Sequence, residues 1–345
     1  MTNFYVHTIG CQQNEHDGAR IRYLLQKLGM LEVAPEKADL IIVVACSVRK
    51  TAVDRIFGNV RNWTKNRSPI PIVVTTGCVL ESDRKKFAKK GILFWDIEKP
   101  DDLSEILHLN NRDISKLLEE GKTYSSSVPI MFGCNNFCTY CATAFTRGRE
   151  RSRVISEVIS DVQNLIKNNH SEILLLGQTI DSYKCPKTGS RLDELFVSLN
   201  ELPGSFTIAF TSNHPKDMTD KIINAVSTLP KIKKEIHLPI QSGSDKILKA
   251  MNRPYTVKKY LEIVNNIKKA NKDIVVTTDV IVGFPGETET DFQKTVDIFN
   301  EVNYKTAYVN KYSPRPGTAA FKLGDPISWK EKQRRWKILN DIANK

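Results

Sequence analysis

The chain has 345 residues, enough for two domains with full cores. Its composition, 40% hydrophobic and 26% charged, is typical of a soluble protein, and it has neither an apolar run of roughly 18 residues nor a signal-type amino terminus, so we expect a cytoplasmic protein without a membrane partner. A net charge of +12, from 51 basic and 39 acidic side chains, favours an anionic partner without proving one.

Residues 1 to about 100 predict a small α/β domain of three or four strand-helix units. Each of three apolar runs ends close to a cysteine and is followed by a helix-like pattern. These runs are Phe4 to Ile9 before Cys11, Leu40 to Ala45 before Cys46, and Ile72 to Thr76 before Cys78. Parallel strands of one sheet would place all three cysteines at its carboxyl edge, where such sheets bind ligands. A single buried cysteine is commonly only a core residue, but three at matching strand ends predict a thiolate triad.

A linker follows this domain. An amphipathic stretch from residue 101 leads to Gly121 and a serine run at 125–127. We therefore predict a first domain over 1–122, a second over 123–328 and a basic carboxyl-terminal helix over 329–345.

The second domain repeats the pattern of a short apolar run followed by a helix. Six strands are predicted, at Val128–Phe132, Ile173–Leu176, Phe206–Phe210, Glu235–Pro239, Ile274–Val282 and Thr306–Tyr312. Helices are expected between them at about 154–168, 191–201, 217–228, 244–270 and 288–302. Six parallel strand-helix units predict an incomplete barrel with its chemistry at the carboxyl ends of the strands.

Three more cysteines follow the first of these strands in a compact pattern. Cys134, Cys138 and Cys141 have the spacing C-x3-C-x2-C. Three thiolates so close together can bind three irons of a four-iron cluster and leave the fourth iron open to a small molecule. A closed zinc site is the alternative, but it needs a fourth ligand, and the next cysteine, Cys185, lies in a turn-like stretch to which we assign no role. In the cytoplasm, seven cysteines favour metal binding or catalysis over disulfides.

Basic and polar residues surround this predicted centre. Four arginines directly follow the triplet, and their guanidinium groups suit phosphate or carboxylate groups of a substrate. They are Arg147, Arg149, Arg151 and Arg153. The later basic clusters, at 84–90, 231–234 and 330–337, fit solvated faces. His214 and His237 fit hydrogen-bonded structural residues better than metal ligands. The segment Gly283–Gly286 is either a turn or a close approach to a nucleotide, and no Walker-type phosphate loop is present.

These strings resemble one family. An aromatic residue, Tyr140, stands before the last cysteine of the triplet, as in radical S-adenosylmethionine enzymes. The wider pattern resembles the methylthiotransferases of that group over nearly the whole chain. The matching strings are Gly133–Cys141, Thr146–Arg153, Leu176–Gln178, Leu238–Asp245, Ile281–Thr288 and Ser313–Thr318.

Three further strings are similar to one branch of the family, the MiaB type, which methylthiolates isopentenyladenosine in tRNA. They are Gly10–Asn14, Cys46–Arg49 and Gly77–Cys78. The resemblance implies a transferase that adds a methylthio group to C2 of an N6-modified adenosine next to the anticodon. The same chemistry on threonylcarbamoyladenosine or on a ribosomal protein side chain stays open, as does a non-catalytic iron-sulfur protein that binds RNA.

The resemblance also assigns cofactors. Cys134, Cys138 and Cys141 would hold a 4Fe-4S cluster whose open iron binds S-adenosylmethionine, and the radical made from that cofactor would attack C2. The upstream triad would hold a second 4Fe-4S cluster that delivers the methylated sulfur. Its residues are Cys11, Cys46 and Cys78. No side chain is expected to be catalytic beyond the clusters, and the electron would come from a donor such as flavodoxin or ferredoxin.

From their places beside the triplet and after strands, we predict that Tyr140, Gln178 and Gln241 line the S-adenosylmethionine pocket. Two departures from the family pattern stand out. Ala45 replaces the more usual threonine before Cys46, and the segment Ala142–Phe145 lacks the usual proline. The sequence ends at Lys345, before the small β-barrel with which family members grip RNA, so tRNA binding is expected to rely more on Arg147–Arg153 and the last basic residues.

Overall fold

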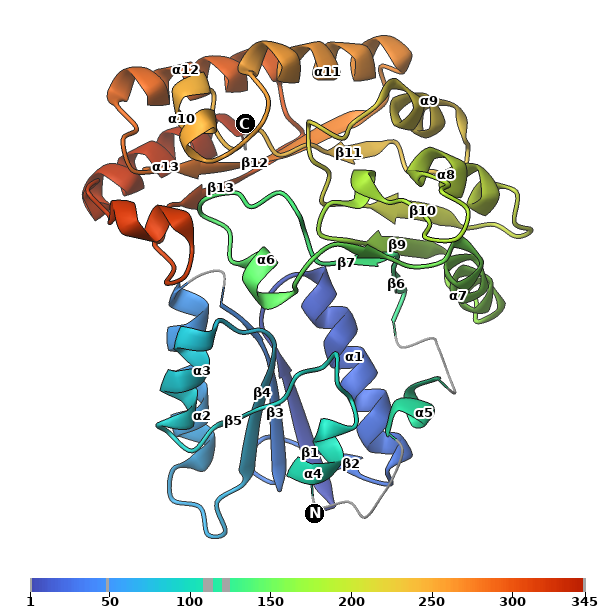
Figure 1. Cartoon of the computed structure of the whole chain (residues 1–345), viewed down its shortest axis with the longest axis vertical. Helices are drawn as coiled ribbons and strands as arrows, with labels where there is room; N and C mark the ends of the chain where they lie inside the picture. Colours follow the sequence, from blue (N-terminus) through green and yellow to red (C-terminus); the bar gives the residue numbers. More distant parts are fainter. Residues whose placement is uncertain (1, 48–49, 108–113, 120–124, 344–345) are drawn as a thin grey trace. The chain divides into compact units, whose positions relative to one another are not determined.

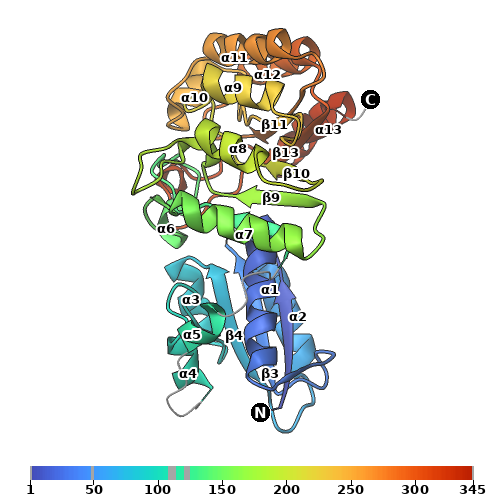
Figure 2. The same ribbon diagram turned by 90° about the vertical axis from the view of Figure 1, so that its right-hand side faces the viewer.

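The computed structural model describes residues 2–47, 50–107, 114–119 and 125–343 (Figures 1 and 2). Two compact units share the chain. The first comprises Met1–Ser127 with Phe145–Arg147, and the second comprises Val128–Ala144 with Gly148–Lys345. The predicted boundary at 122/123 falls within 120–124, outside the described residues.

The first unit contains a five-stranded sheet in which every neighbouring pair is parallel (Figure 1). In spatial order its strands are β2 (Leu31–Glu32), β1 (Asn3–Thr8), β3 (Leu40–Cys46), β4 (Ile72–Cys78) and β5 (Leu93–Phe94). The three apolar runs predicted from the sequence are the central strands β1, β3 and β4. The two short edge strands, β2 and β5, were not predicted, because each has only two residues and therefore shows no periodicity.

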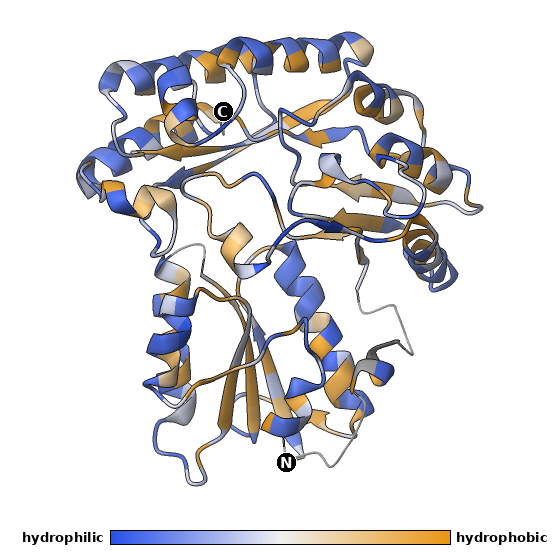
Figure 3. Cartoon of the chain, in the orientation of Figure 1, coloured by the Kyte–Doolittle hydropathy of each residue, from blue (hydrophilic) through white to orange (hydrophobic). Residues whose placement is uncertain are grey.

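Burial on both faces explains why β3 is an unbroken apolar run. Successive side chains alternate between two separate cores, as the period of a strand requires. Leu40, Ile42 and Val44 belong to one core, whereas Ile41, Val43 and Ala45 belong to the other. Figure 3 shows these strands as the most hydrophobic part of the unit.

Helices cover both cores. The core around Leu40 is completed by α1 (Gln12–Lys27), α4 (Asp102–Ile106) and α5 (Ile114–Glu119). The core around Ile41 is completed by α2 (Lys50–Thr64) and α3 (Glu81–Ala88). Apart from the two-residue edge strand β2, which precedes β3 directly, strand alternates with helix from β1 to α3. This arrangement places the carboxyl ends of the strands at one edge.

The second unit contains the predicted strands in two three-stranded sheets, in which β9 pairs parallel with β10 and β12 pairs parallel with both β11 and β13. One sheet has the order β10 (Thr207–Phe210), β9 (Glu172–Leu176), β6 (Ser127–Pro129), and the other has the order β11 (Glu235–His237), β12 (Val275–Val282), β13 (Thr306–Lys311). The first predicted strand is broken at Ile130. Its second part, β7 (Met131–Phe132), pairs antiparallel with β8 (Arg151–Ser152) on the far side of the cysteine loop.

The helices of this unit occur where the sequence predicts them, with one correction. They are α7 (Ile155–Lys167), α8 (Leu192–Asn200), α9 (Asp220–Thr228), α10 (Asp245–Ala250), α11 (Val257–Ala270) and α12 (Glu289–Val302). A single helix over 244–270 was wrong, because the chain leaves the helix at Asn252, where φ is +56°, and Pro254 cannot continue it. The short elements α6 (Thr143–Thr146), η1 (Ile180–Ser182) and η2 (Ala319–Leu323) lie in the connections.

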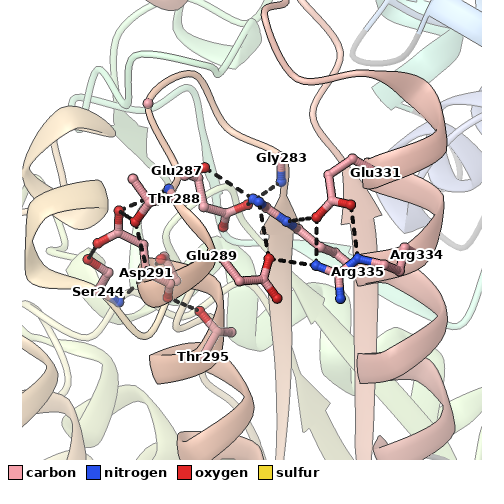
Figure 4. A network of polar contacts seen from close by, with 12 residues as sticks. Ser244, Gly283, Glu287, Thr288, Glu289, Asp291, Thr295, Glu331, Arg334 and Arg335 are labelled. Atoms are coloured by element: carbon pink, nitrogen blue, oxygen red, sulfur yellow. Dashed lines mark hydrogen bonds and ion pairs between the residues drawn. The ribbon is translucent and has the colours of Figure 1, made fainter.

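The basic carboxyl-terminal segment forms α13 (Trp329–Ala343) and is not simply a solvated face (Figure 4). Arg335 is buried and donates to the carboxylate of Glu287 at 2.6 Å, and the same carboxylate accepts from the backbone N–H of Gly283 at 2.6 Å. Lys332 is also buried and donates to the carbonyl of Tyr312 at 2.9 Å. Helix α13 therefore holds the Gly283–Glu287 turn in place through these buried hydrogen bonds.

Among the described residues, no helix combines the length and apolar character needed to span a membrane.

The buried pair predicts a measurable loss of stability. Replacing Arg335 by Met leaves the Glu287 carboxylate, whose side chain is 1% exposed, without its cation, and should lower the free energy of unfolding by about 3–5 kcal/mol. Urea denaturation followed by tryptophan fluorescence measures this, since Trp336 lies in the same helix. The matched control is Glu289→Gln, which removes an acceptor that is 59% exposed and should cost about 1 kcal/mol or less. Equal losses in the two variants would contradict the assigned role of the pair.

Candidate functional site

The structure brings the three upstream cysteines to one edge of the first sheet. Cys46 and Cys78 are the last residues of β3 and β4 and are direct partners in the register of those strands. Cys11 follows β1 and is the residue before the first turn of α1. Because β1, β3 and β4 are neighbours, residues 35 and 32 positions apart in the sequence meet at the carboxyl edge.

Asn14 holds the ends of two of these strands. Its amide Nδ2 donates to the carbonyl of Ile9 at 2.8 Å and to that of Ala45 at 3.0 Å. Gly10 permits this, since φ there is +146° and a Cβ would lie 2.4 Å from Nδ2 of Asn14 and 3.1 Å from Cβ of Cys46. No role was predicted for Gly10 or Asn14, although both stand in the string Gly10–Asn14 that resembles the family.

Arg147 belongs by its contacts to this same unit. Its Nη2 donates to Oδ2 of Asp17 at 2.6 Å, and its Nε donates to Sγ of Cys78 at 2.9 Å. Burial raises the pKa of the Cys78 thiol, and the Arg147 charge acts against that rise. The expectation that Arg147 faces a substrate phosphate or carboxylate was therefore wrong, because the side chain is only 3% exposed and is already paired.

Of the other three arginines of that group, one is paired within the fold and two are exposed. Arg153 pairs with Asp161 at 2.8 Å and donates to the carbonyl of Pro129. Arg149 and Arg151 are exposed, and the guanidinium of Arg149 lies 4.5 Å from the ring centre of Phe137. Arg149 therefore presents both a charge and an aromatic neighbour to solvent.

The downstream triplet lies in the loop between β7 and β8. The loop turns at Gly133, where φ is +73° and a Cβ would lie 2.1 Å from the carbonyl oxygen of Arg149. Each sulfur receives a hydrogen bond. The donors are the backbone N–H of Asn136 to Cys134 (3.4 Å), the guanidinium of Arg253 to Cys138 (3.4 Å) and the backbone N–H of Thr143 to Cys141 (3.4 Å). Such N–H···S contacts are typical of thiolates that bind a cluster.

Burial raises the pKa of Cys141 to about 11, and Cys138 and Cys134 add to the rise. The three sulfurs therefore lie close enough to repel one another as thiolates, which a bound cation would relieve. Within the described ranges, no three His, Cys, Asp or Glu side chains converge as a single metal ion requires. A four-iron cluster instead binds each cysteine at a separate iron, around the outside of the cluster.

Several buried polar atoms without a hydrogen-bond partner lie just after the strands that neighbour this loop. Cys134 contacts the hydroxyl of Thr179 at 3.2 Å, immediately after β9 and Gln178. Five buried side-chain atoms in these strand-end segments have no hydrogen-bond partner among the described residues. They are Oε1 of Gln178, Oδ1 of Asp181, Oδ1 of Asn213, Nε2 of His214 and Oε1 of Gln241. The set has four oxygens and one N–H donor, Nε2 of His214, since Nδ1 of that imidazole accepts from Lys216. An unpaired buried polar atom costs about 1–3 kcal/mol, so this set fits a bound polar molecule that both donates and accepts hydrogen bonds.

Of the three predicted pocket residues, Gln178 and Gln241 belong to this set, and Tyr140 lies in the cysteine loop. Gln241 follows β11 with φ at +68°, and its backbone bonds with Asp279 and Ile281 beside it. Tyr140 is half-buried against an apolar cluster that includes Met251 and Phe284. Burial raises the pKa of the Tyr140 hydroxyl well above its usual value, so it stays protonated.

The two histidines are hydrogen-bonded, as expected. Nδ1 of His214 accepts from the backbone of Lys216 at 3.2 Å, and burial lowers the pKa of this imidazole to about 2. His237 contacts Thr277 at 2.9 Å and Asp279 at 3.2 Å.

Arg253 and Thr179 are contacts that the sequence did not reveal. Both act on cysteines 45 or more positions away, and neither stands in a string that carried the resemblance. The only local signal for Arg253 is the helix break before Pro254, which places the arginine outside a regular helix.

Comparisons with known proteins agree with this geometry. The radical SAM superfamily matches residues 128–299, and the uncharacterized protein family UPF0004 matches residues 3–94. The second match covers the sheet that carries Cys11, Cys46 and Cys78.

Curated relatives match almost the whole chain. A tRNA-2-methylthio-N(6)-dimethylallyladenosine synthase of Clostridium botulinum is 36% identical over 99% of this chain and 81% of that relative. The protein of the same description from Thermoanaerobacter pseudethanolicus is 38% identical over 99% of this chain and 78% of its own length.

A solved structure supports the fold. The radical S-adenosylmethionine methyltransferase TsrM from Kitasatospora setae superposes with a TM-score of 0.66 over 93% of this chain and 77% of that chain, at 10% identity. The identities to the curated relatives and the match to the radical SAM superfamily show that the chain belongs to the radical S-adenosylmethionine methylthiotransferase family, in the group of the tRNA-2-methylthio-N(6)-dimethylallyladenosine synthases.

Proposed function

We propose that this chain is a transferase that adds a methylthio group to C2 of N6-dimethylallyladenosine in tRNA. The observation that carries the proposal is the identity of 36–38% to synthases of that description along 99% of the chain. The two cysteine triads support it as well. The upstream triad lies at the carboxyl edge of a parallel sheet, the downstream triad lies in the loop between β7 and β8, and each includes sulfurs that accept hydrogen bonds.

Cys134, Cys138 and Cys141 would hold one 4Fe-4S cluster, and Cys11, Cys46 and Cys78 would hold the second. When bound, the clusters and S-adenosylmethionine supply the radical, the sulfur and the methyl group. The residues fit three-thiolate clusters, since three cysteines leave one iron of each cluster open.

The surrounding side chains position these groups. Arg253 holds the Cys138 sulfur and also donates to the carbonyl of Pro239, which links the cysteine loop to the end of β11. Gln178 and Gln241 offer unsatisfied acceptors to the ammonium, hydroxyl and amino groups of S-adenosylmethionine. Tyr140 contributes an apolar surface beside the last cysteine.

The proposed function implies two partners, tRNA and a protein that donates electrons. Exposed Arg149, beside Phe137, suits a tRNA phosphate and a neighbouring base, since guanidinium and aromatic groups are the usual contacts to RNA backbone and bases. A reducing protein of the flavodoxin or ferredoxin class would supply the electron, in the cytoplasm.

Iron content tests the two sites separately. Anaerobically reconstituted protein should carry about eight irons per chain, and replacing either cysteine triad by alanine should leave about four. Colorimetric iron and sulfide assays on the three proteins measure this. The control is Cys185→Ala, which removes a buried cysteine outside both triads and should leave the iron unchanged. If a triple variant keeps its fold but carries no iron at all, the triad that it still contains binds no cluster, and the proposal fails for that triad.

Cofactor affinity tests the predicted pocket residues. Gln178→Ala, Gln241→Ala and Tyr140→Leu should each weaken S-adenosylmethionine binding by about five- to tenfold, the loss of roughly 1 kcal/mol of contact. Anaerobic calorimetry on reconstituted protein provides the dissociation constants. Gln293→Ala, an exposed residue of α12, is the matched control and should bind as the parent does. Unchanged affinity in all three variants would remove these residues from the pocket.

Product analysis tests the reaction itself. With reductant, S-adenosylmethionine and tRNA containing N6-dimethylallyladenosine, the parent should form the 2-methylthio nucleoside, detected by mass spectrometry. Cys46→Ala should still release 5′-deoxyadenosine but form no methylthio product, whereas Cys138→Ala should form neither. Product on threonylcarbamoyladenosine or on a ribosomal protein instead would overturn the substrate assignment.

A further inference from the structure

The proposed activity gives no role to Arg147, yet this is one of the most completely bonded side chains in the first unit. Its Nε donates to Sγ of Cys78 at 2.9 Å, and its Nη2 donates to Oδ1 of Asn14 at 3.0 Å and to Oδ2 of Asp17 at 2.6 Å. The side chains of Arg147 and Asp17 are 3% and 5% exposed. Burying a charge away from water is costly, so we expect this guanidinium to have a specific role in the site around it.

The direction of these bonds identifies the sulfur as an acceptor. A guanidinium carries only donors and keeps its charge at any ordinary pH. Cys78 therefore presents sulfur lone pairs to Arg147, which suits an iron-bound thiolate, and its Sγ also lies 3.9 Å from Oδ1 of Asn14. Hydrogen bonds to cluster sulfurs are among the main ways in which a protein sets a reduction potential.

The guanidinium is fixed with respect to the strand ends. Asp17, which also accepts from Nε2 of Gln13 at 3.1 Å, aligns one edge of Arg147. Asn14 contacts the same edge through its oxygen, while its Nδ2 bonds the ends of β1 and β3. One short segment of α1 thus orients both the arginine and the backbone that carries the cysteines.

We propose that Arg147 is a positioning residue for the cluster bound by Cys11, Cys46 and Cys78: it holds the Cys78 sulfur through an N–H···S bond, and its positive charge raises the reduction potential of that cluster. The inference rests on the proposed function, because it requires a cluster at this triad. Reduction adds one electron and one negative charge to the cluster, so a cation beside a ligating sulfur favours the reduced state. Asp17 tempers the effect with its opposite charge.

The chain order gives this assignment a further consequence. Arg147 stands six residues after Cys141, so the loop that supplies the three downstream thiolates continues into the residue that acts on the upstream cluster.

The test uses the full chain with Cys134, Cys138 and Cys141 replaced by alanine, so that only the upstream cluster is present. The midpoint potential is measured by electron paramagnetic resonance at set potentials, with dithionite as the one-electron donor. Arg147→Gln should disfavour reduction at least tenfold, a shift of about 59 mV to more negative potential. Arg147→Lys keeps the charge and should shift the potential less. Asp17→Asn removes the tempering charge and should shift the potential in the opposite, positive direction.

The controls separate this inference from the proposed function. Arg335→Gln also removes a buried arginine paired with a carboxylate, but its described partners are glutamates, so the upstream cluster should keep its potential. If the parent triple variant binds no cluster, the proposed function fails. If the cluster forms and its potential and spectrum are unchanged in Arg147→Gln and Asp17→Asn, the role of Arg147 is overturned while the proposed function stands. Should Arg147→Gln fail to fold, the direction of the shift in nearly isosteric Asp17→Asn decides alone.

Discussion

The whole account depends on a constraint of parallel sheets: strands that run in the same direction end at the same edge. In the first unit this constraint brings Cys46 and Cys78 into register and places Cys11 beside them, although long helices separate the three in sequence. Asn14 then bonds the ends of β1 and β3, so the edge is held by a side chain as well as by the sheet. In the second unit, parallel strands place unsatisfied acceptors such as Gln178 and Gln241 at strand ends near the cysteine loop.

Hydrogen bonding distinguishes these cysteines from ordinary core residues. A structural cysteine packs as a small apolar group, whereas Cys78, Cys134, Cys138 and Cys141 each accept from an N–H group. Two of the donors are the buried arginines Arg147 and Arg253, and both charges lie against sulfur. Each set of three cysteines therefore has a buried arginine against one of its sulfurs. Such a positive charge would offset the negative charge of a bound iron-sulfur cluster.

The sequence predicted the parts of this arrangement that periodicity and spacing record. Apolar runs located the central strands, and the short C-x3-C-x2-C spacing and the strand-end cysteines located the candidate metal ligands. Contacts between residues far apart in the sequence leave no such pattern, so the bond from Arg253 to Cys138 and the contact between Thr179 and Cys134 were missed. Local composition also misled: Lys332 and Arg335 stand in a basic run typical of a solvated surface, and Arg147 stands in a group expected to face a substrate. Each of the three is instead buried beside a specific acceptor.

Native mass spectrometry of the intact, anaerobically reconstituted chain tests the central claim most directly, because it counts clusters and identifies the metal in one measurement. The account predicts a mass increase corresponding to two Fe4S4 groups on a single polypeptide, one for each set of three thiolates. A chain that carries one cluster at most, or that carries zinc in place of iron, would contradict it.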